Sequence, residues 1–227
     1  MLSSQPEAPP VVVVLTGGAS RRMGSHKPVL DVGGRPLVAR VLDAAGERPA
    51  LVVGPGQGVP EGVRVVWERV PGGGPVAGLS TAVETLVDDA TVGAAPLPYA
   101  VVLLAADLPF VTSAHVDRLL TALGSADLAV TVDRGGRTNW LCSAWRLTAL
   151  RARLDDVGDA YGRSMRELAD GLRTQPVDDP AEVALDVDTP ADLERARDRA
   201  RDGARGRARG PARDRARDRS ADASSPD

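Results

Sequence analysis

The chain has 227 residues, a formal net charge of −3 and only 3% aromatic residues, which suits one α/β domain with a core of Val, Leu and Ala side chains. Its single cysteine, Cys142, excludes an internal disulfide and a zinc site built from several cysteines, and we expect it to be a buried apolar side chain. The N-terminus lacks the pattern of a secretory signal and no apolar run approaches the ~20 residues of a membrane span, so we expect a soluble cytoplasmic protein without membrane contact.

Apolar runs bounded by Gly or Pro predict strands, and apolar residues at helical spacing predict helices. The expected strands are 11–15, 50–53, 63–66, 99–105, 128–132, 139–144 and 173–177. The expected helices are 36–45, 76–87, 113–123, 147–154 and 164–172, and a last helix that begins at Pro190. Ser113 and Thr189 are the expected N-caps of the helices that they begin. Strands that alternate with helices predict an α/β fold with a mostly parallel sheet and helices on both faces.

Composition divides the chain into three parts. Residues 1–10 form a lead that we expect to be disordered, residues 11–197 form the domain, and residues 198–227 are an Arg/Asp/Ala-rich tail that we also expect to be disordered. Asp–Arg pairs in the start of the tail can extend the last helix. Residues 195–227 hold 11 Arg and 6 Asp, so an electrostatic arm for RNA, DNA or an acidic partner is the alternative to a solvated tail. We expect no nucleic-acid binding, because the tail has no aromatic residue to stack on bases.

Three motif-bearing loops follow expected strands, after Leu15, Val66 and Ala105. Ligands of parallel α/β sheets bind beyond the carboxyl ends of the strands, so the shared position of these loops indicates one site. Asp107 lies in the third loop, where a carboxylate can hold Mg²⁺ together with substrate phosphates; a turn or capping aspartate is the alternative. For Asp188, the alternative is an ordinary helix start at Asp-Thr-Pro.

The first loop runs from Leu15 to Lys27 with the sequence Leu-Thr-Gly-Gly-Ala-Ser-Arg-Arg-Met-Gly-Ser-His-Lys. Its glycines let backbone N–H groups approach phosphate oxygens, and its cations lie beside the same cavity. Lys27 is the only lysine among 28 Lys and Arg residues, which indicates a need for a compact ammonium. A P-loop is excluded because Gly18 and Gly24 are too far apart and Pro28 follows the lysine, and G-x-G-x-x-G is absent. We therefore predict a nucleoside triphosphate site of another kind.

This loop resembles the signature loop of the nucleotidyltransferases that attach nucleotides to molybdopterin, and most of all the molybdenum cofactor guanylyltransferase (MobA-type) family. Segments 73–79, 106–109 and 186–193 follow in the family's order, so the resemblance covers about residues 11–197. It implies a Rossmann-like three-layer α/β domain, a Mg²⁺ ion, and transfer of GMP from GTP to molybdopterin with release of pyrophosphate. The double glycine Gly17-Gly18 resembles the guanylyl branch, which favours GTP over CTP.

The resemblance also implies roles for single residues. Arg22, Lys27 and Asp107 are implied to be catalytic, with Arg22 and Lys27 facing the phosphates and Asp107 holding Mg²⁺. Asp188 is implied as a further metal ligand, and Asp186 and Asp188 as contacts to the acceptor. The implied nucleotide-binding residues are Leu15, Thr16, Gly17, Gly18, Arg22, Lys27, Gly78 and Asp107.

The chain departs from the family's pattern in several places. It has Glu68-Arg69 where we expect a Glu-Asp pair, and if that aspartate normally contacts guanine or ribose, base selectivity is affected. Gly54 stands where some members have asparagine, and residues 137–141 lack the usual proline. We expect the glycines at 72–74 to form a mobile flap over the base, with a plain turn as the alternative.

The sequence leaves alternatives open for the tryptophans and for the function. Trp140 and Trp145 are expected to pack in the core, with a pterin pocket as the alternative. The same fold with CTP, or with a sugar-phosphate or phospholactate acceptor, is one alternative function, and a non-catalytic nucleotide-binding protein is another. The presence of both Lys27 and Asp107 favours catalysis, because binding alone has less need of a metal ligand. A partner protein that delivers molybdopterin is compatible with the sequence.

Overall fold

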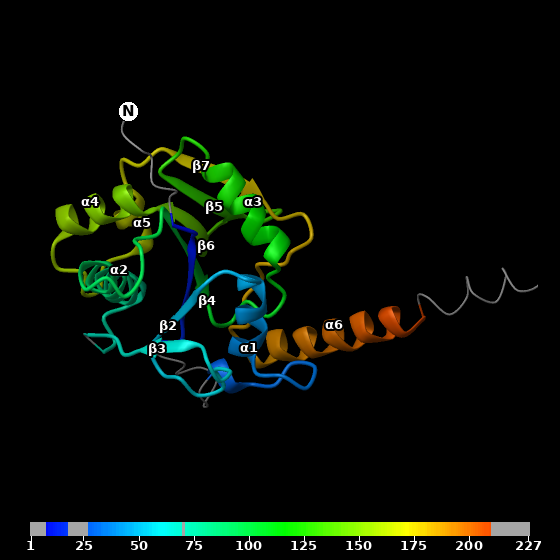
Figure 1. The fold of residues 1–227 in the computed structure, drawn as a ribbon. Coiled ribbons are helices and arrows are strands. Elements are labelled where there is room, and N and C mark those ends of the chain that lie inside the picture. The colour runs from blue at the N-terminus through cyan, green and yellow to red at the C-terminus, as the bar shows by residue number, and fades with distance from the viewer. Residues whose placement is uncertain (1–7, 18–26, 70, 210–227) are drawn as a thin grey trace, which may run out of the picture.

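The computed structural model describes residues 8–17, 27–69 and 71–209, which contain a seven-stranded sheet between two layers of helices (Figure 1). The strands are β1 (Val11–Leu15), β2 (Ala50–Val53), β3 (Arg64–Val66), β4 (Ala100–Ala105), β5 (Leu128–Val132), β6 (Thr138–Arg146) and β7 (Thr174–Asp178). Their order across the sheet is β3-β2-β1-β4-β6-β5-β7. β6 is antiparallel to β4 and β5, and the other neighbouring pairs are parallel. The predicted mostly parallel sheet is confirmed.

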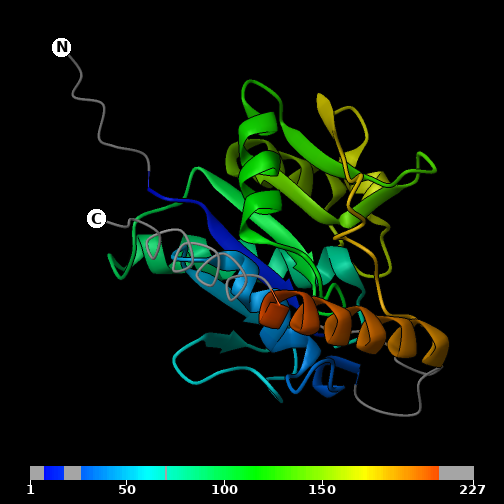
Figure 2. The same cartoon turned by 90° about the vertical axis from the view of Figure 1, so that its right-hand side faces the viewer.

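The helices cover both faces of the sheet, as predicted (Figure 1). One face is covered by α1 (Leu37–Leu42), the 3-10 turn η2 (Asp43–Ala45) and α3 (Ser113–Leu123), and the other by α2 (Pro75–Thr91), α4 (Leu147–Val157) and α5 (Met165–Ala169). A further 3-10 turn, η1 (Lys27–Val29), precedes α1, and α6 (Pro190–Arg209) lies beside α1 (Figure 2). In the part of the chain that the structure describes, no helix combines the length and apolar character that crossing a bilayer requires.

The central strand β1 shows why both faces are apolar. Val12 and Val14 belong to the core under α1 and α3, whereas Val11 and Val13 belong to the core under α2, α4 and α5. Successive residues of a strand point to opposite faces, so a strand covered on both sides needs an unbroken apolar run. Burying each valine contributes roughly 1.5–3 kcal/mol toward offsetting the entropy lost on folding.

Two helix starts test the predicted caps. The hydroxyl of Thr112, and not that of Ser113, caps α3 by accepting a hydrogen bond from the His115 backbone nitrogen at 3.2 Å. Thr189 caps α6 as predicted: its Oγ1 accepts from the Asp192 nitrogen at 3.2 Å. In return, the Asp192 carboxylate accepts from the Thr189 nitrogen at 2.8 Å. This reciprocal capping fixes the point at which the chain turns from the segment of Asp188 into α6.

α6 is longer than the composition indicated. The domain was expected to end at residue 197, but the helix continues to Arg209, so residues 198–209 are helical and the extension that the Asp–Arg pairs allowed is the outcome observed. Ion pairs at i,i+3 spacing run along it, namely Arg195–Asp192, Arg201–Asp198 and Arg205–Asp202. The predicted disorder of residues 1–10 is wrong for Ala8, which is buried and pairs with Pro98, and the predictions for residues 1–7 and 210–227 lie outside the described residues.

Candidate active site

Three chain segments are tied together at the carboxyl edge of the sheet. A hydrogen bond of 3.0 Å from the Ala106 nitrogen to the Leu15 carbonyl joins the loop after β4 to the end of β1. The carbonyl of Asp107 in the same loop accepts a bond of 3.1 Å from the Val187 nitrogen, in the segment before α6. Lys27, at the start of η1, reaches this point from the far end of the glycine loop. Motifs far apart in the sequence therefore meet at one edge.

Lys27 lies at the centre of this site. Its Nζ donates to Asp107 Oδ2 and to Asp188 Oδ1, each at 2.6 Å. The side chain of Lys27 is 12% exposed and that of Asp107 is 22% exposed. Burial alone lowers the pKa of the Lys27 ammonium, but attraction to Asp107 and Asp188 outweighs it, so the pKa is raised above its ordinary value. Lys27 is therefore a fixed cation at neutral pH.

Asp186 and Asp188 interact electrostatically and have opposite pKa shifts. Desolvation, followed by repulsion from Asp188 and Asp107, raises the pKa of Asp186 above its ordinary value. The hydrogen bond from Lys27 lowers the pKa of Asp188, although partial burial opposes this effect. Of the pair, Asp186 is therefore the first to take up a proton as pH falls.

The residue between these two aspartates anchors them. Val187 is 2% exposed and packs with Leu37 of α1 and Leu193 of α6 in a small apolar cluster. Its neighbours Asp186 and Asp188 are exposed. The side chain of Asp188 faces the site, because it accepts a hydrogen bond from Lys27. The cluster at the root of α6 thus positions the second carboxylate of the site.

The hydroxyl of Thr16 is used inside the protein. Its Oγ1 donates to the Pro55 carbonyl at 2.8 Å and lies 3.2 Å from the Val53 carbonyl. The hydroxyl hydrogen of Thr16 is therefore not available to a nucleotide. Gly54 packs against this point with a φ of +113°, and a Cβ placed on it would lie 2.7 Å from the Gly17 nitrogen. Glycine at 54 lets the loop after β2 support the loop after β1.

Glu68 is a site residue that we did not assign from the sequence. A Cβ on Gly17 would lie 1.8 Å from Glu68 Oε1, so the carboxylate rests against the Gly17 backbone. Its Oε2 accepts a hydrogen bond from the Gly72 nitrogen at 3.1 Å. A Cβ on Gly78 of α2 would lie 3.9 Å from Oε1. Glu68 thus links the first glycine loop to the second, and its sequence signals were its place just after β3 and its match to the Glu of the expected Glu-Asp pair.

Arg69, the departure from the family's pattern, points toward α2. Its Nε lies 2.9 Å from Glu84 Oε2 and its Nη2 lies 3.3 Å from Asp88 Oδ2. The Arg69 side chain is 62% exposed, so each pair contributes little to stability. The guanidinium is therefore held on the outer face of α2, whereas the neighbouring Glu68 turns toward Gly17.

The second glycine loop is tied to its surroundings. Gly72 and Gly74 have φ values of +74° and +87°, which glycine adopts without strain. The Gly73 carbonyl accepts a hydrogen bond from the Gly162 nitrogen, between α4 and α5, at 2.8 Å. Pro75 follows as the first residue of α2, a position that suits proline. Closure of this loop over a base stays a prediction.

Trp140, Trp145 and Cys142 pack against the core. Trp145 is 0% exposed, and its Nε1 donates to Ser143 Oγ at 2.8 Å, so core packing is confirmed for this residue. Trp140 is half-buried against the core under α2, α4 and α5. Cys142 is buried as predicted, and burial raises the pKa of its thiol to about 12.

The site suits a Mg²⁺ ion that is shared with a substrate. Among residues 8–17, 27–69 and 71–209, no three His, Cys, Asp or Glu side chains are grouped to hold a metal ion. Asp107 and Asp188 nevertheless both bind one cation, the Lys27 ammonium. Mg²⁺ typically takes one or two carboxylates and completes its shell with waters and substrate phosphates. Gly18 and Arg22, which were predicted to join this site, lie outside the described residues.

Comparison with known proteins matches nearly the whole folded part of the chain. A family model described as the MobA-like NTP transferase domain matches residues 12–177. The molybdenum cofactor guanylyltransferase of Rhodobacter capsulatus is 32% identical over 191 residues, which cover 81% of this chain and 93% of that protein. A probable molybdenum cofactor guanylyltransferase of Mycobacterium marinum is 35% identical over 189 residues, covering 80% of this chain and 90% of that protein.

Solved structures share the fold. Molybdopterin-guanine dinucleotide biosynthesis protein A from Archaeoglobus fulgidus has a TM-score of 0.64 at 20% identity, covering 83% of this chain and 97% of that one. 2-C-methyl-D-erythritol 4-phosphate cytidylyltransferase from Thermus thermophilus has a TM-score of 0.58 at 24% identity, covering 83% of this chain and 98% of that one. The predicted Rossmann-like three-layer α/β architecture is confirmed by this likeness.

Proposed function

We propose, because this chain belongs to the MobA-like NTP transferase family, that it transfers GMP from GTP to molybdopterin and releases pyrophosphate. The observation that carries the proposal is the Lys27 ammonium held between Asp107 and Asp188 at the carboxyl edge of the sheet. A fixed cation beside two carboxylates, at the end of a glycine-rich loop, suits a metal-bound triphosphate. The names of the guanylyltransferase relatives support GTP and molybdopterin as substrates.

In the proposed reaction, a phosphate oxygen of molybdopterin attacks the α-phosphorus of GTP in line. A new P–O bond forms, the bond between the α-phosphorus and the bridging oxygen breaks, and its electron pair leaves with pyrophosphate. Such a transition state is stabilised by positioning and charge neutralisation. The attacking oxygen is already anionic, so the reaction needs neither a covalent enzyme intermediate nor a general base.

Lys27 is the residue that we propose to neutralise charge on the α-phosphoryl group and the pyrophosphate. Its raised pKa supports this role, because the ammonium stays protonated at neutral pH. The hydrogen bonds to Asp107 and Asp188 hold it at the end of β1 before substrate binds. Arg22 is proposed as a second cation for the same phosphates on the sequence alone.

Asp107 and Asp188 are the residues that we propose to hold Mg²⁺, which would neutralise the triphosphate when bound. The position of both carboxylates around one cation supports this assignment. Asp186, exposed beside Asp188, is proposed to contact molybdopterin. We further propose that the nucleotide is contacted by Leu15, Thr16, Gly17, Gly18 and Gly78.

The test measures pyrophosphate release by the purified protein with Mg²⁺, molybdopterin and each of GTP, CTP, ATP and UTP. We expect release with GTP and molybdopterin. Release with CTP instead would assign the cytidylyl reaction, and release only with a sugar phosphate or phospholactate would change the acceptor. Binding of GTP and Mg²⁺ without release from any acceptor would identify a non-catalytic protein. The cytoplasmic location and the delivery of molybdopterin by a partner protein remain predictions from the sequence.

A further inference from the structure

The carboxylate of Glu68 lies where three glycine-containing segments meet. Its Oε1 occupies the space that a side chain on Gly17 would fill, with 1.8 Å to an added Cβ. Gly78 on α2 faces the same oxygen, and the Gly72 nitrogen donates to the other oxygen at 3.1 Å. The adjacent cation, Arg69, is bound to the outer face of α2 instead. The loops after β1 and β3 and the start of α2 are thus shaped around one carboxylate.

The charges of the site give a nucleotide one orientation. The Lys27 ammonium lies on the β4 side, where it bonds Asp107, whereas Glu68 follows β3, beyond β2 in the order of the sheet. A triphosphate is attracted by Lys27 and repelled by Glu68. A nucleotide that crosses Gly17 with its phosphates at Lys27 therefore brings its base or ribose to Glu68. A carboxylate there can only accept hydrogen bonds, so it selects a group that presents donors.

We propose that Glu68 selects guanine by accepting hydrogen bonds from its N1–H and its 2-amino group. These adjacent donors match the two oxygens of one carboxylate, whereas adenine and cytosine present a ring nitrogen acceptor beside their amino group. Uracil has one N–H between two carbonyl oxygens. This inference rests on the proposed transfer of GMP from GTP, and it names the residue of that site that sets the choice of base.

Xanthosine and inosine triphosphates test this proposal, because both keep N1–H and differ from guanine at C2, although the C2 oxygen of xanthine also places a titratable proton on N3. Inosine lacks the 2-amino group, and xanthine carries an oxygen acceptor there. Binding to the full-length protein is measured by titration calorimetry with Mg²⁺. The wild type is expected to bind GTP about 10- to 100-fold more tightly than the inosine and xanthosine nucleotides, the value of one hydrogen bond to a charged group.

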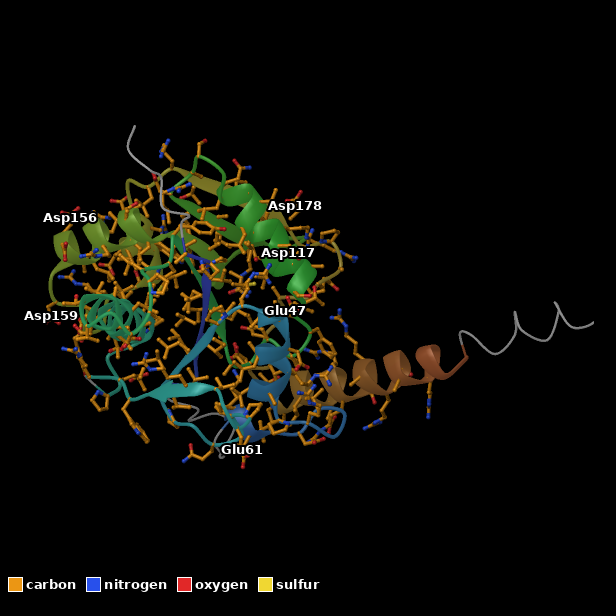
Figure 3. All side chains as sticks on the ribbon, viewed as in Figure 1. Glu47, Glu61, Asp117, Asp156, Asp159 and Asp178 are labelled. Atoms are coloured by element: carbon orange, nitrogen blue, oxygen red, sulfur yellow. The ribbon has the colours of Figure 1, made fainter. Side chains whose placement is uncertain are left out.

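Glu68→Gln is expected to reverse the order of GTP and xanthosine triphosphate. The glutamine carbonyl still accepts from N1–H, but its amide donates to the oxygen at C2 of xanthine and meets a donor on guanine. GTP affinity should fall about 10- to 100-fold while xanthosine triphosphate gains. The matched control is Glu61→Gln, which removes the same charge from the exposed loop between β2 and β3 (Figure 3). Glu61→Gln should leave the ratios of the affinities for GTP, inosine triphosphate and xanthosine triphosphate unchanged.

Several results would overturn the proposal. If Glu68 binds the ribose, Glu68→Gln weakens all nucleotides by one factor and leaves the ratio of GTP to xanthosine triphosphate unchanged. Equal binding of GTP and inosine triphosphate by the wild type refutes it without any variant. The two proposals can also fail separately. If Glu68→Gln reverses the preference for GTP but the wild type releases no pyrophosphate with molybdopterin, the role of Glu68 in base selection stands and the transfer reaction is refuted. No wild-type preference for GTP over CTP refutes both.

Discussion

The ammonium of Lys27 is the single charge on which the proposed chemistry depends most. Lys27→Met keeps the length of the side chain and removes its charge, so we expect kcat/KM for pyrophosphate release to fall about 10²–10³-fold. The melting temperature should fall too, because Asp107 and Asp188 then face each other without their shared cation. Arg205→Met, at an exposed position on α6, should change neither value. Full turnover by Lys27→Met would refute the assigned role.

Substitutions of Gly54 and Gly62 distinguish the effect of backbone strain from the effect of a contact with the site. Both have positive φ values, +113° and +84°, but a Cβ on Gly54 would lie 2.7 Å from the Gly17 nitrogen, whereas one on Gly62 meets nothing within 4 Å. Gly62→Ala should cost about 1 kcal/mol of unfolding free energy and no activity. Gly54→Ala should cost more and should also raise KM for GTP, because Gly17 must shift. Urea unfolding and initial rates check this pair, and equal effects of the two variants would contradict it.

Site residues were predictable where the sequence near them, or the composition of the chain, distinguishes them. Lys27 is distinguished by composition and Asp107 by its place after an apolar strand, and the structure brings them together across 80 positions. The orientation of Glu68 and Arg69 was not predictable. After an edge strand of three residues, either of these side chains can point toward the site. Only the packing of Gly17 and Gly78 against one of them decides which side chain enters the site.

At the level of elements, strands were predicted more accurately than the last helix. β1, β2 and β5 have the predicted bounds, because continuous apolar runs between glycines and prolines have few alternative arrangements. For α6, the missing apolar stripe beyond residue 198 predicted a disordered tail, whereas the Asp–Arg pairs left open an extension of the helix. Its i,i+3 ion pairs and its anchored first turns carry the helix further than hydrophobic pattern alone indicates.

The two parts of α6 should respond differently to mutation. Removing residues 201–227 should leave kcat/KM and the melting temperature nearly unchanged, because residues 201–205 are exposed and their ion pairs contribute only tenths of a kcal/mol. Leu193→Ala should instead cost about 2–3 kcal/mol and lower activity, because it loosens the cluster that anchors Val187 beside Asp188. Chemical denaturation and rate measurements distinguish the two variants. Salt-dependent RNA binding that the truncation abolishes would show that the tail is an electrostatic arm.

The whole molecule explains why one edge carries all the motifs. β1 lies between β2 and β4, so the parallel strands β1, β2, β3 and β4 end at the same side of the sheet. α1 covers one face of the sheet and α2 the other (Figure 1), and the strand order turns back at β1, which is where ligands of open α/β sheets bind. The antiparallel direction of β6 follows from its connection to β5, because residues 133–137 are too few for the crossover that parallel neighbours need.

A buried histidine should make the stability of the whole domain depend on pH. His115 of α3 is 1% exposed; its Nε2 lies 2.8 Å from Thr131 Oγ1 and its Nδ1 lies 2.6 Å from a guanidinium nitrogen of Arg118. Beside the Arg118 donor, Nδ1 must be an acceptor, so the ring is neutral. Desolvation, assisted by Arg118 and opposed by Asp179, lowers the pKa of His115 below its ordinary value. The folded state therefore resists a proton that the unfolded chain accepts.

Because the unfolded chain binds that proton near the ordinary histidine pKa of about 6.5, stability is fully present above this pH and is lost as pH falls below it. The free energy of unfolding should fall by at most about 1.4 kcal/mol per pH unit. His115→Gln can keep both hydrogen bonds without titrating, so its curve should be flatter between about pH 5 and 7. His26, the other of the two histidines, is present in both proteins and cancels in the difference. The raised pKa of Asp186 acts with the opposite sign, but Asp186 is likewise present in both proteins, so parallel curves would show that His115 imposes no such dependence.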